Sequence, residues 1–160
     1  VFAYGSNMHL ADLRRWLTQH DYPCDGIYDV QPALIEGYEL VWNYRSKARS
    51  GGAANVQKAP SATLWGLALA VCATTFEGLD AKEGHPHRYH RGAHPKATTL
   101  IGPERRVESW LYQVLPEFTH PTPQLPRQAY LQLMVDAAEQ FAAPPDYMLS
   151  LRTLQRSCPS

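Results

Sequence analysis

Near the start of the chain, a short continuous run of apolar residues is followed by apolar residues at helical spacing. Residues 1–4 are mostly apolar and end at Gly5, which predicts a short strand closed by a tight turn. Ser6 or Asn7 is the expected cap of the helix that follows, because a short side-chain oxygen can accept hydrogen bonds from its first N–H groups. Four apolar residues, three or one apart, form one face of this helix: Leu10, Leu13, Trp16 and Leu17.

Residues 27–115 carry a different pattern, in which short β-branched and aromatic runs are separated by glycine, proline and serine. Such runs are typical of strands in a meandering sheet or barrel. A polar loop is expected over residues 45–52, and Gly102 with Pro103 predicts a hairpin turn. The predicted strands cover residues 27–30, 33–43, 53–57, 64–71, 90–95, 97–101 and 107–115.

One short helix interrupts the predicted strands. Thr74 and Glu77 have the spacing of a capping box, in which each side chain bonds the backbone near the other residue. Gly84 stands where a glycine commonly ends a helix, because glycine adopts the left-handed conformation without a steric penalty. Glu83 is therefore predicted to be the last residue of this helix.

The C-terminal third of the chain predicts two more helices after a proline-rich loop. Pro144 and Pro145 separate them, because proline cannot continue a helix. The first helix has an apolar stripe with helical period, which indicates core packing: Tyr130, Leu133, Met134, Ala137 and Phe141. The second, shorter helix is indicated by Tyr147, Leu151 and Leu154.

The length and charge of the chain exclude some classes of function. A chain of 160 residues fits a single domain over residues 1–160. Lysine and arginine together number 15, as do aspartate and glutamate, so the net charge is zero. A basic field for nucleic acid is therefore not expected. The longest apolar-rich run, residues 64–73, is far shorter than the roughly 20 residues that cross a bilayer. We expect a soluble, cytoplasmic protein with no nucleic-acid or membrane partner.

Two segments could carry chemistry on their pattern alone. Residues 5–8 lie between a strand end and a helix start, where free N–H groups attract a carboxylate or an oxyanion. The same residues also suit an ordinary turn. Glu83, at a helix C-terminus, should have a raised pKa, which suits a general base, although a solvated acid is the alternative reading. Asp80, three residues earlier, is the competing carboxylate.

Metal and phosphate sites are less well supported. The histidines at positions 85, 87, 90 and 94 fall close together, but Pro86 and Pro95 break the segment. The three cysteines, Cys24, Cys72 and Cys158, form no CxxC pair, so neither a disulfide scaffold nor a thiolate zinc site is indicated. We interpret the histidines as solvated loop residues. The basic cluster of Arg45, Lys47 and Arg49 is interpreted as a surface loop rather than a phosphate site.

Four segments together resemble the gamma-glutamylcyclotransferase family in order and spacing. They are FAYGSNM at residues 2–8, GGAANV at 51–56, LWG at 64–66 and LDAKEG at 79–84. The likeness runs from residue 1 to about residue 154 and is greatest for the branch that carries FAYGSN, which includes antibiotic-tailoring enzymes.

The resemblance implies an α+β fold, a small mixed β-barrel flanked by helices. It also implies release of 5-oxoproline from a gamma-glutamyl amino acid or amine, without cofactor or metal. In that reaction the α-amine of the substrate attacks its own γ-carbonyl, so the protein needs no nucleophile. No nucleophile motif occurs in the chain, which agrees with this expectation.

The resemblance also assigns roles to individual residues. Glu83 matches the catalytic glutamate, which serves as base and then as acid. Tyr89 lies near the position of a tyrosine that reaches the site in relatives. Another tyrosine of some relatives is replaced here by Leu125, which affects the leaving-group pocket, and Tyr130 substitutes for it only if its helix starts at a shifted position. The expected substrate-binding loop consists of Tyr4, Gly5, Ser6, Asn7 and Met8.

Two alternatives to this function stay open from the sequence. The same chemistry could act on a gamma-glutamyl-protected biosynthetic intermediate, with a different leaving group. A non-catalytic ligand-binding domain could also share the fold, because fold does not determine function. The sequence leaves the oligomeric state undecided as well, since some relatives form homodimers.

Overall fold

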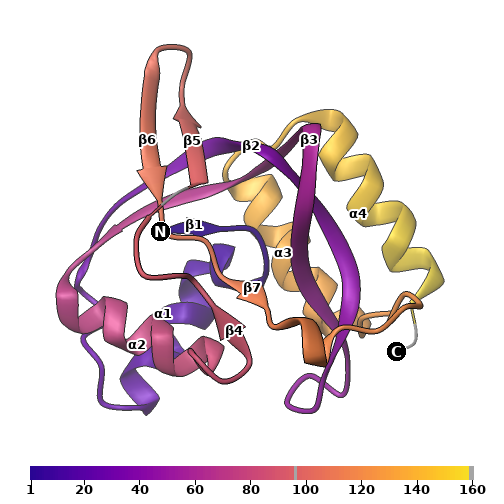
Figure 1. Ribbon diagram of the computed structural model, residues 1–160, viewed down its shortest axis with the longest axis horizontal. Helices are drawn as coiled ribbons and strands as arrows, with labels where there is room; N and C mark the ends of the chain where they lie inside the picture. Colours follow the sequence, from indigo (N-terminus) through magenta and orange to yellow (C-terminus); the bar gives the residue numbers. More distant parts are fainter. Residues whose placement is uncertain (96, 159–160) are drawn as a thin grey trace.

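A five-stranded antiparallel sheet carries the fold in the computed structural model, which describes residues 1–95 and 97–158 (Figure 1). Its strands, in spatial order, are β1 (Phe2–Ala3), β3 (Gly51–Val71), β2 (Ile27–Ser46), β5 (Ala97–Ile101) and β6 (Arg105–Ser109). A second sheet pairs β4 (Tyr89–His90) with β7 (Gln113–Val114). The last two residues of the predicted domain, 159 and 160, lie outside the described residues.

The two longest strands, β2 and β3, each join two strands that the sequence predicted separately. Their ladder continues through irregularities in register between Ile27 and Asp29, between Glu36 and Tyr38, and between Val41 and Tyr44. Such bulges let a strand continue past residues that interrupt its pattern while increasing its twist. The predicted loop over residues 45–52 is consequently a short turn at residues 47–50.

The sheet is open, so the expected barrel describes it only loosely. The two edge strands, β1 and β6, are not paired with each other in the strand order. One backbone hydrogen bond, from Phe2 N–H to the Trp110 carbonyl at 2.9 Å, links β1 to the chain just beyond β6. The strand pairings are antiparallel rather than mixed in direction. The α+β class itself is confirmed.

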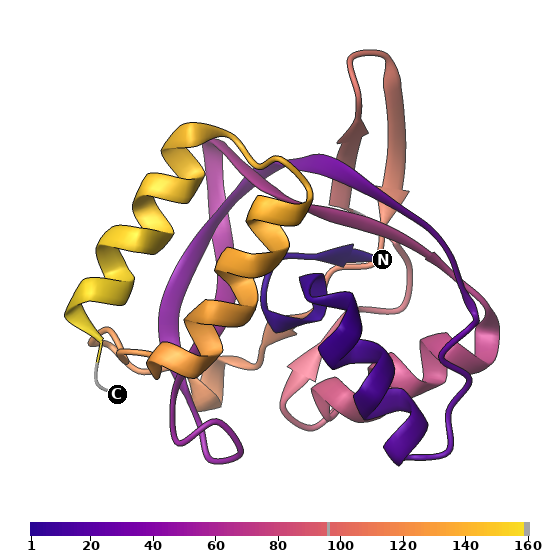
Figure 2. The ribbon, with the colours of Figure 1, turned by 180° about the vertical axis from the view of Figure 1, so that it is seen from behind.

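In the described part of the chain, four α-helices pack against the sheet in two pairs (Figure 2). They are α1 (Leu10–Gln19), α2 (Ala73–Glu83), α3 (Gln128–Gln140) and α4 (Pro145–Ser157), with short 3₁₀ turns η1 (Ser6–Met8) and η2 (Pro116–Phe118). Helices α3 and α4 lie side by side, while α1 meets α2 at Gly78, where an added methyl would be 2.6 Å from Leu17. None of the described helices is both long and apolar enough to span a membrane.

The ends of α1 and α2 determine the direction of the chain segments that flank these helices. The sequence predicted Ser6 or Asn7 as the cap of α1. This prediction is wrong, because both residues lie in η1. His9 is the cap, and its Nδ1 accepts from the Asp12 N–H at 3.1 Å. Helix α2 is capped by Cys72 rather than Thr74. Its predicted end is confirmed: Glu83 is its last residue.

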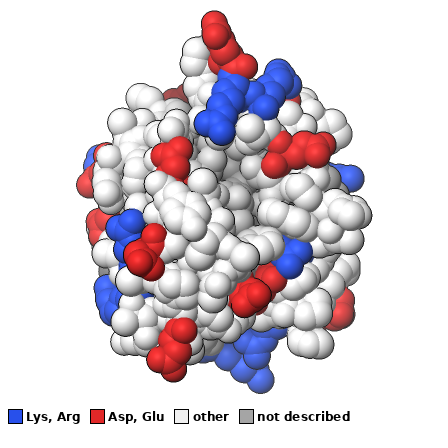
Figure 3. All heavy atoms as spheres, turned by 90° about the vertical axis from the view of Figure 1, so that its left-hand side faces the viewer, with Lys and Arg blue, Asp and Glu red and all other residues white. Residues whose placement is uncertain are grey.

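The hairpin of β5 and β6 projects from the body of the molecule, with the predicted turn at Gly102 (Figure 1). The strand predicted over residues 90–95 is reduced to β4, and the one over residues 107–115 is divided between β6 and β7. Acidic and basic side chains are interspersed on the face drawn in Figure 3. That face therefore presents no extended surface of a single charge.

Gly66 allows strand β1 to pack closely against β3, because it has no side chain. A Cβ at this position would collide with the Ala3 carbonyl oxygen and stand 2.6 Å from Phe2 Cζ. We expect Gly66→Ala to lower the free energy of unfolding by about 2 kcal/mol or more, measured by urea denaturation. Thr63→Ala, at an exposed position of the same strand, should change it by less than about 0.5 kcal/mol. Equal stabilities of the two variants would contradict the close approach of β1.

Candidate active site

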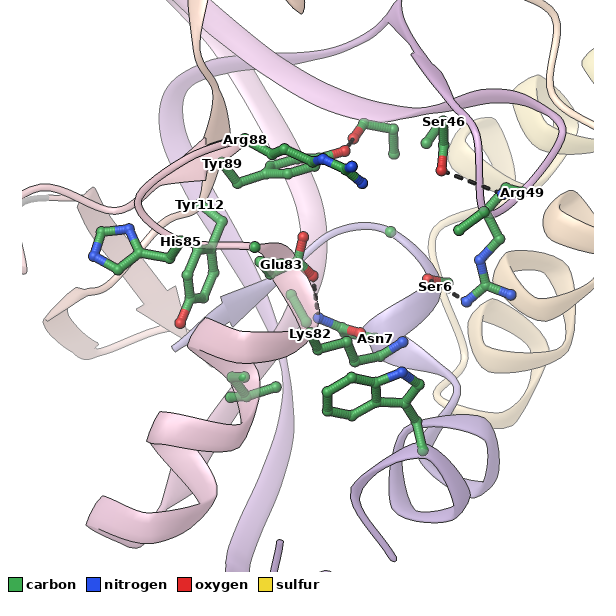
Figure 4. A pocket seen from close by; sticks show the side chains of 18 of the residues that line it. Ser6, Asn7, Ser46, Arg49, Lys82, Glu83, His85, Arg88, Tyr89 and Tyr112 are labelled. Carbon is green, nitrogen blue, oxygen red and sulfur yellow. Dashed lines mark hydrogen bonds between the residues drawn. The ribbon is translucent and has the colours of Figure 1, made fainter. Parts of the chain in front are cut away.

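A cavity of about 690 Å³ opens where β1, η1, the end of α2 and the turn between β2 and β3 converge (Figure 4). Five of the six predicted substrate-binding residues line this cavity together with the predicted base Glu83: Tyr4, Gly5, Ser6, Asn7 and Tyr89. Met8 is the exception. Its side chain is fully buried in the core, and its N–H bonds to the Gly5 carbonyl at 3.0 Å within the η1 turn.

Glu83 meets the N-terminal loop through one short hydrogen bond. Its Oε1 accepts from Asn7 Nδ2 at 2.6 Å. Removal from water raises the pKa of the carboxyl group above its usual value, while the charge of Lys82, the Asn7 hydrogen bond and the charge of Arg49 act in the opposite direction. A carboxylate with a raised pKa in a cavity has the properties of a general base.

Asp80, the competing carboxylate, is already hydrogen-bonded to Arg91 and Tyr112. Arg91 Nε and Nη2 bond its two oxygens at 2.7 Å each, and the Tyr112 hydroxyl donates to it at 2.6 Å. Burial favours the neutral acid, but the hydrogen bonds from Arg91 and Tyr112 bring its pKa below the usual value. Arg91 itself lies over the rings of Phe76 and Trp110. Asp80 therefore anchors the last turns of α2, and of these two carboxylates it is Glu83 that lines the cavity.

The backbone N–H groups of the loop are not equivalent. The Tyr130 hydroxyl lies against the Ser6 backbone N–H, and Met8 N–H is taken within η1. Within residues 1–95 and 97–158, the structure gives no hydrogen-bond acceptor to the N–H of Gly5 or of Asn7. The Asn7 Oδ1 atom is also buried without a partner in that part of the chain. The unsatisfied polar groups of the loop are thus concentrated at Gly5 and Asn7.

Three buried tyrosines form walls of the cavity by bonding to the backbone. Tyr4 donates to the Tyr112 carbonyl at 2.6 Å, and Tyr89 donates to the Ala54 carbonyl at 2.9 Å. Tyr130 accepts from the Ala54 N–H at 3.2 Å. Burial raises the pKa of all three hydroxyls, so they remain protonated at neutral pH.

The structure shows where Leu125 and Tyr130 lie relative to the cavity. Leu125 is exposed and does not line the cavity. Helix α3 begins at Gln128, which places Tyr130 in its first turn with the hydroxyl at Gly5. An added Cβ on Gly5 would be 2.9 Å from this hydroxyl. A tyrosine from the C-terminal region therefore reaches the N-terminal loop.

Positively charged side chains around the cavity were missed by the sequence interpretation. Arg49 lines the cavity instead of extending into solvent, and its Nη2 is 3.4 Å from Ser6 Oγ. Lys82 and Arg88 also line the cavity. Burial lowers the pKa of Lys82. The adjacency of Lys82 to Glu83 was a usable signal, whereas nothing local in the sequence distinguishes Arg49 from the exposed Arg45.

The histidine segment does not form a metal centre in the part of the chain that the structure describes, where no group of three or more metal-ligating side chains comes together. His85 and His87 line the cavity. His85 packs against the Tyr112 ring at 6.3 Å between centroids, and its Nδ1 is buried without a described partner.

Comparison with known proteins identifies similar folds and one sequence family. The family model described as gamma-glutamyl cyclotransferase, AIG2-like, matches residues 1–132. No curated protein sequence matches the chain. A solved gamma-glutamyl cyclotransferase has a TM-score of 0.75 at 17% identity, covering 94% of this chain and 84% of its own.

Two further solved structures are similar to the chain. The uncharacterized protein loc79017 from Homo sapiens has a TM-score of 0.73 at 19% identity, covering 95% of this chain and 85% of its own. YkqA from Bacillus subtilis has a TM-score of 0.76 at 21% identity, covering 100% of this chain and 55% of its own. At these identities the likeness shows the fold.

The raised pKa of Glu83 makes a prediction about stability. The folded chain binds this proton more tightly than the unfolded chain, so the stabilisation is complete below the unfolded pKa and is lost as the pH rises through the folded pKa. We expect Glu83→Gln to unfold at a higher urea concentration than wild type at pH 7. The difference should shrink as the pH falls toward the unfolded value of about 4.3. Glu77→Gln, at an exposed position on α2, should show no such pH-dependent gain. The same gain in both variants would contradict the raised pKa of Glu83.

Proposed function

Because the chain belongs to the AIG2-like gamma-glutamyl cyclotransferase family, we propose that it releases 5-oxoproline from a gamma-glutamyl amino acid or amine, with Glu83 as base and then acid. One observation carries the proposal: the Glu83 carboxylate, at the end of α2, is bonded to Asn7 of the N-terminal loop inside one cavity. A general base and unsatisfied polar groups thus face the same space.

The first step needs the substrate amine as a nucleophile. Glu83 removes one proton from the α-ammonium group, and the nitrogen lone pair then attacks the γ-carbonyl carbon. A new C–N bond closes a five-membered ring, and the carbonyl oxygen takes up negative charge. The reaction is intramolecular, so holding the bent substrate is worth an effective concentration of about 10⁵–10⁸ M.

The second step expels the leaving group. The protonated Glu83 returns its proton to the leaving nitrogen, the original amide C–N bond breaks, and the carbonyl re-forms as the lactam of 5-oxoproline. The ring nitrogen still carries one proton too many, which the ionised Glu83 takes up and passes to the departing amine. The products are 5-oxoproline and the protonated amine, and Glu83 is again ionised. One carboxylate therefore balances the proton transfers, and no cofactor enters these steps.

The N-terminal loop would stabilise the charge that develops on the carbonyl oxygen. The N–H groups of Gly5 and Asn7 have no acceptor among the described residues, so they can donate to an oxyanion without breaking an existing bond. Because η1 is separated from α1 by the extended residue His9, this stabilisation comes from individual N–H groups rather than from the dipole of a long helix. Met8 is not part of this proposed contact.

Replacement of the base tests the role of Glu83. We expect Glu83→Gln to lower kcat for 5-oxoproline release by at least about 10²-fold, because glutamine cannot accept the proton. In wild type, activity should fall on the acidic side with the raised Glu83 pKa, since protonation removes the base. The product is measured by mass spectrometry, and Glu77→Gln is the matched control on α2. Turnover by folded Glu83→Gln at the wild-type rate would contradict the assignment.

A substrate panel tests the reaction and separates the alternative substrates. Chelator-treated protein is incubated with gamma-glutamyl amino acids and with larger gamma-glutamyl amines, and both 5-oxoproline and free glutamate are measured. We expect 5-oxoproline, with unequal rates that identify the leaving group; a preference for large amines would favour a protected intermediate. Free glutamate as the product would contradict cyclisation, because water would then be the nucleophile. Binding of 5-oxoproline without turnover in calorimetry would instead support a ligand-binding domain.

A further inference from the structure

Arg49 brings a guanidinium group to the cavity from an unexpected direction. It belongs to the turn at residues 47–50, which connects the long strands β2 and β3. In Figure 4 the side chains of Ser6 and Asn7 lie between Arg49 on one side and Glu83 on the other. The turn therefore supplies a positive charge across the loop from the proposed base.

Several contacts hold Arg49 in this position. Its backbone N–H donates to Ser46 Oγ at 3.3 Å, which fixes the turn. Its Nη2 is 3.4 Å from Ser6 Oγ and 3.4 Å from Asp12 Oδ2. The guanidinium also lies over the Tyr130 ring, 5.5 Å from the centroid. Three segments distant in sequence thus orient this one side chain.

Most of the hydrogen-bonding capacity of Arg49 is unused. A guanidinium carries five N–H donors, and the contacts to Ser6 and Asp12 both use Nη2 at the long end of the hydrogen-bond range. Nε and Nη1 have no acceptor in the described part of the chain, and the side chain is 32% exposed. Asp12 also lies 3.8 Å from Arg15, so it does not neutralise Arg49 alone. The arrangement leaves an edge of the guanidinium able to take a carboxylate in a two-point contact.

The other cations that line the cavity are placed differently. Arg15 is 3.8 Å from Asp12, and its side chain is 62% exposed. Lys82 lies over the Trp16 ring at 5.4 Å from the centroid and is next to Glu83 in sequence. Arg88 is exposed and lies beside Tyr89 in Figure 4. Of these four side chains, Arg49 is the one that hydrogen-bonds the N-terminal loop itself.

We propose that Arg49 binds the α-carboxylate of the gamma-glutamyl group and so positions the α-amine at Glu83, an inference that rests on the proposed function. The α-ammonium and α-carboxylate of this group share one carbon, so they must be held by two neighbouring groups of opposite charge. Glu83 and Arg49 line the same cavity from the two sides of the loop, and the charge of Arg49 acts on the pKa of Glu83, so the cavity offers both charges to one substrate group. Arg49 is thus a specificity-determining residue for a free α-carboxylate.

A comparison of two substrates tests this role. The first is a gamma-glutamyl dipeptide that the enzyme turns over, and the second is the same compound with its α-carboxylate converted to a carboxamide. Wild type should prefer the first. Arg49→Gln should lose about 10- to 100-fold in kcat/KM on the first substrate, mainly through KM, and change little on the second. A merely structural role would lower both equally, and that outcome would overturn the proposal.

Two matched variants serve as controls. Arg45→Gln makes the same chemical change at an exposed position of the same hairpin, outside the cavity, and should leave both substrates unaffected. Arg49→Lys keeps the charge but loses the planar fork, so it should retain part of the preference for the carboxylate substrate. Loss of the preference in Arg45→Gln to the same extent would also contradict the proposal.

Calorimetry separates failure of this inference from failure of the proposed function. Wild type should bind 5-oxoproline at least about 10-fold more tightly than Arg49→Gln does, and both should bind 5-oxoprolinamide equally weakly. If no substrate is turned over but this pattern is found, the proposed reaction is wrong and the carboxylate site stands. If 5-oxoproline binds wild type and Arg49→Gln equally, or binds neither, the role of Arg49 is refuted, whatever the activity.

Discussion

The hydrogen bond from Asn7 to Glu83 joins residues 76 positions apart and brings the first turn of the chain to the end of α2. It requires two helices to stop at definite residues. Gly84, with φ of 67°, ends α2 directly after Glu83, and His9 keeps η1 separate from α1. Because an α-helix turns by about 100° per residue, one more or one fewer residue before Glu83 would turn its carboxylate away from the loop. The cavity therefore depends on where backbone conformations change as much as on which side chains are present.

The environment of Glu83 combines opposing electrostatic effects. Burial favours the neutral acid, while Lys82, Asn7 and Arg49 favour the carboxylate, and the net result is a raised pKa. A base must be ionised to accept a proton and basic enough to hold it, and this opposition satisfies both needs. The cost falls on stability, because the folded chain keeps a partly desolvated carboxylate that water would solvate better. Asp80, one turn earlier, illustrates the opposite case: direct pairing with Arg91 holds it as a carboxylate with a lowered pKa.

Local signals in the sequence predicted the parts of the site that local interactions determine. The end of α2 at Glu83 and Gly84 was predictable because the left-handed glycine and the apolar spacing lie within a few residues of each other. The continuity of β2 and β3 was not, because bulges depend on the partner strand. The position of Arg49 was missed for the same reason: its side chain is oriented by Ser6, Asp12 and Tyr130, which all lie far from it in the sequence. Tyr130 reaches the loop because α3 begins at Gln128, and helix starts are poorly determined by sequence.

The tyrosines and the charged residues of the cavity have separate physical tasks. Tyr4, Tyr89 and Tyr130 use their hydroxyls on backbone atoms, and their raised pKa values keep these bonds intact over the pH range in which Glu83 titrates. The walls of the cavity therefore do not change with the protonation of the base. In the proposed cyclisation, a substrate held in a bent form reacts at a high effective concentration, so rigid walls would contribute to kcat, while the proposed carboxylate contact of Arg49 would contribute to KM. These groups come from the residue after β1, the β2–β3 turn, the end of α2, β4 and α3, so different segments of the chain supply the shape of the cavity, its positive charge and the proposed base.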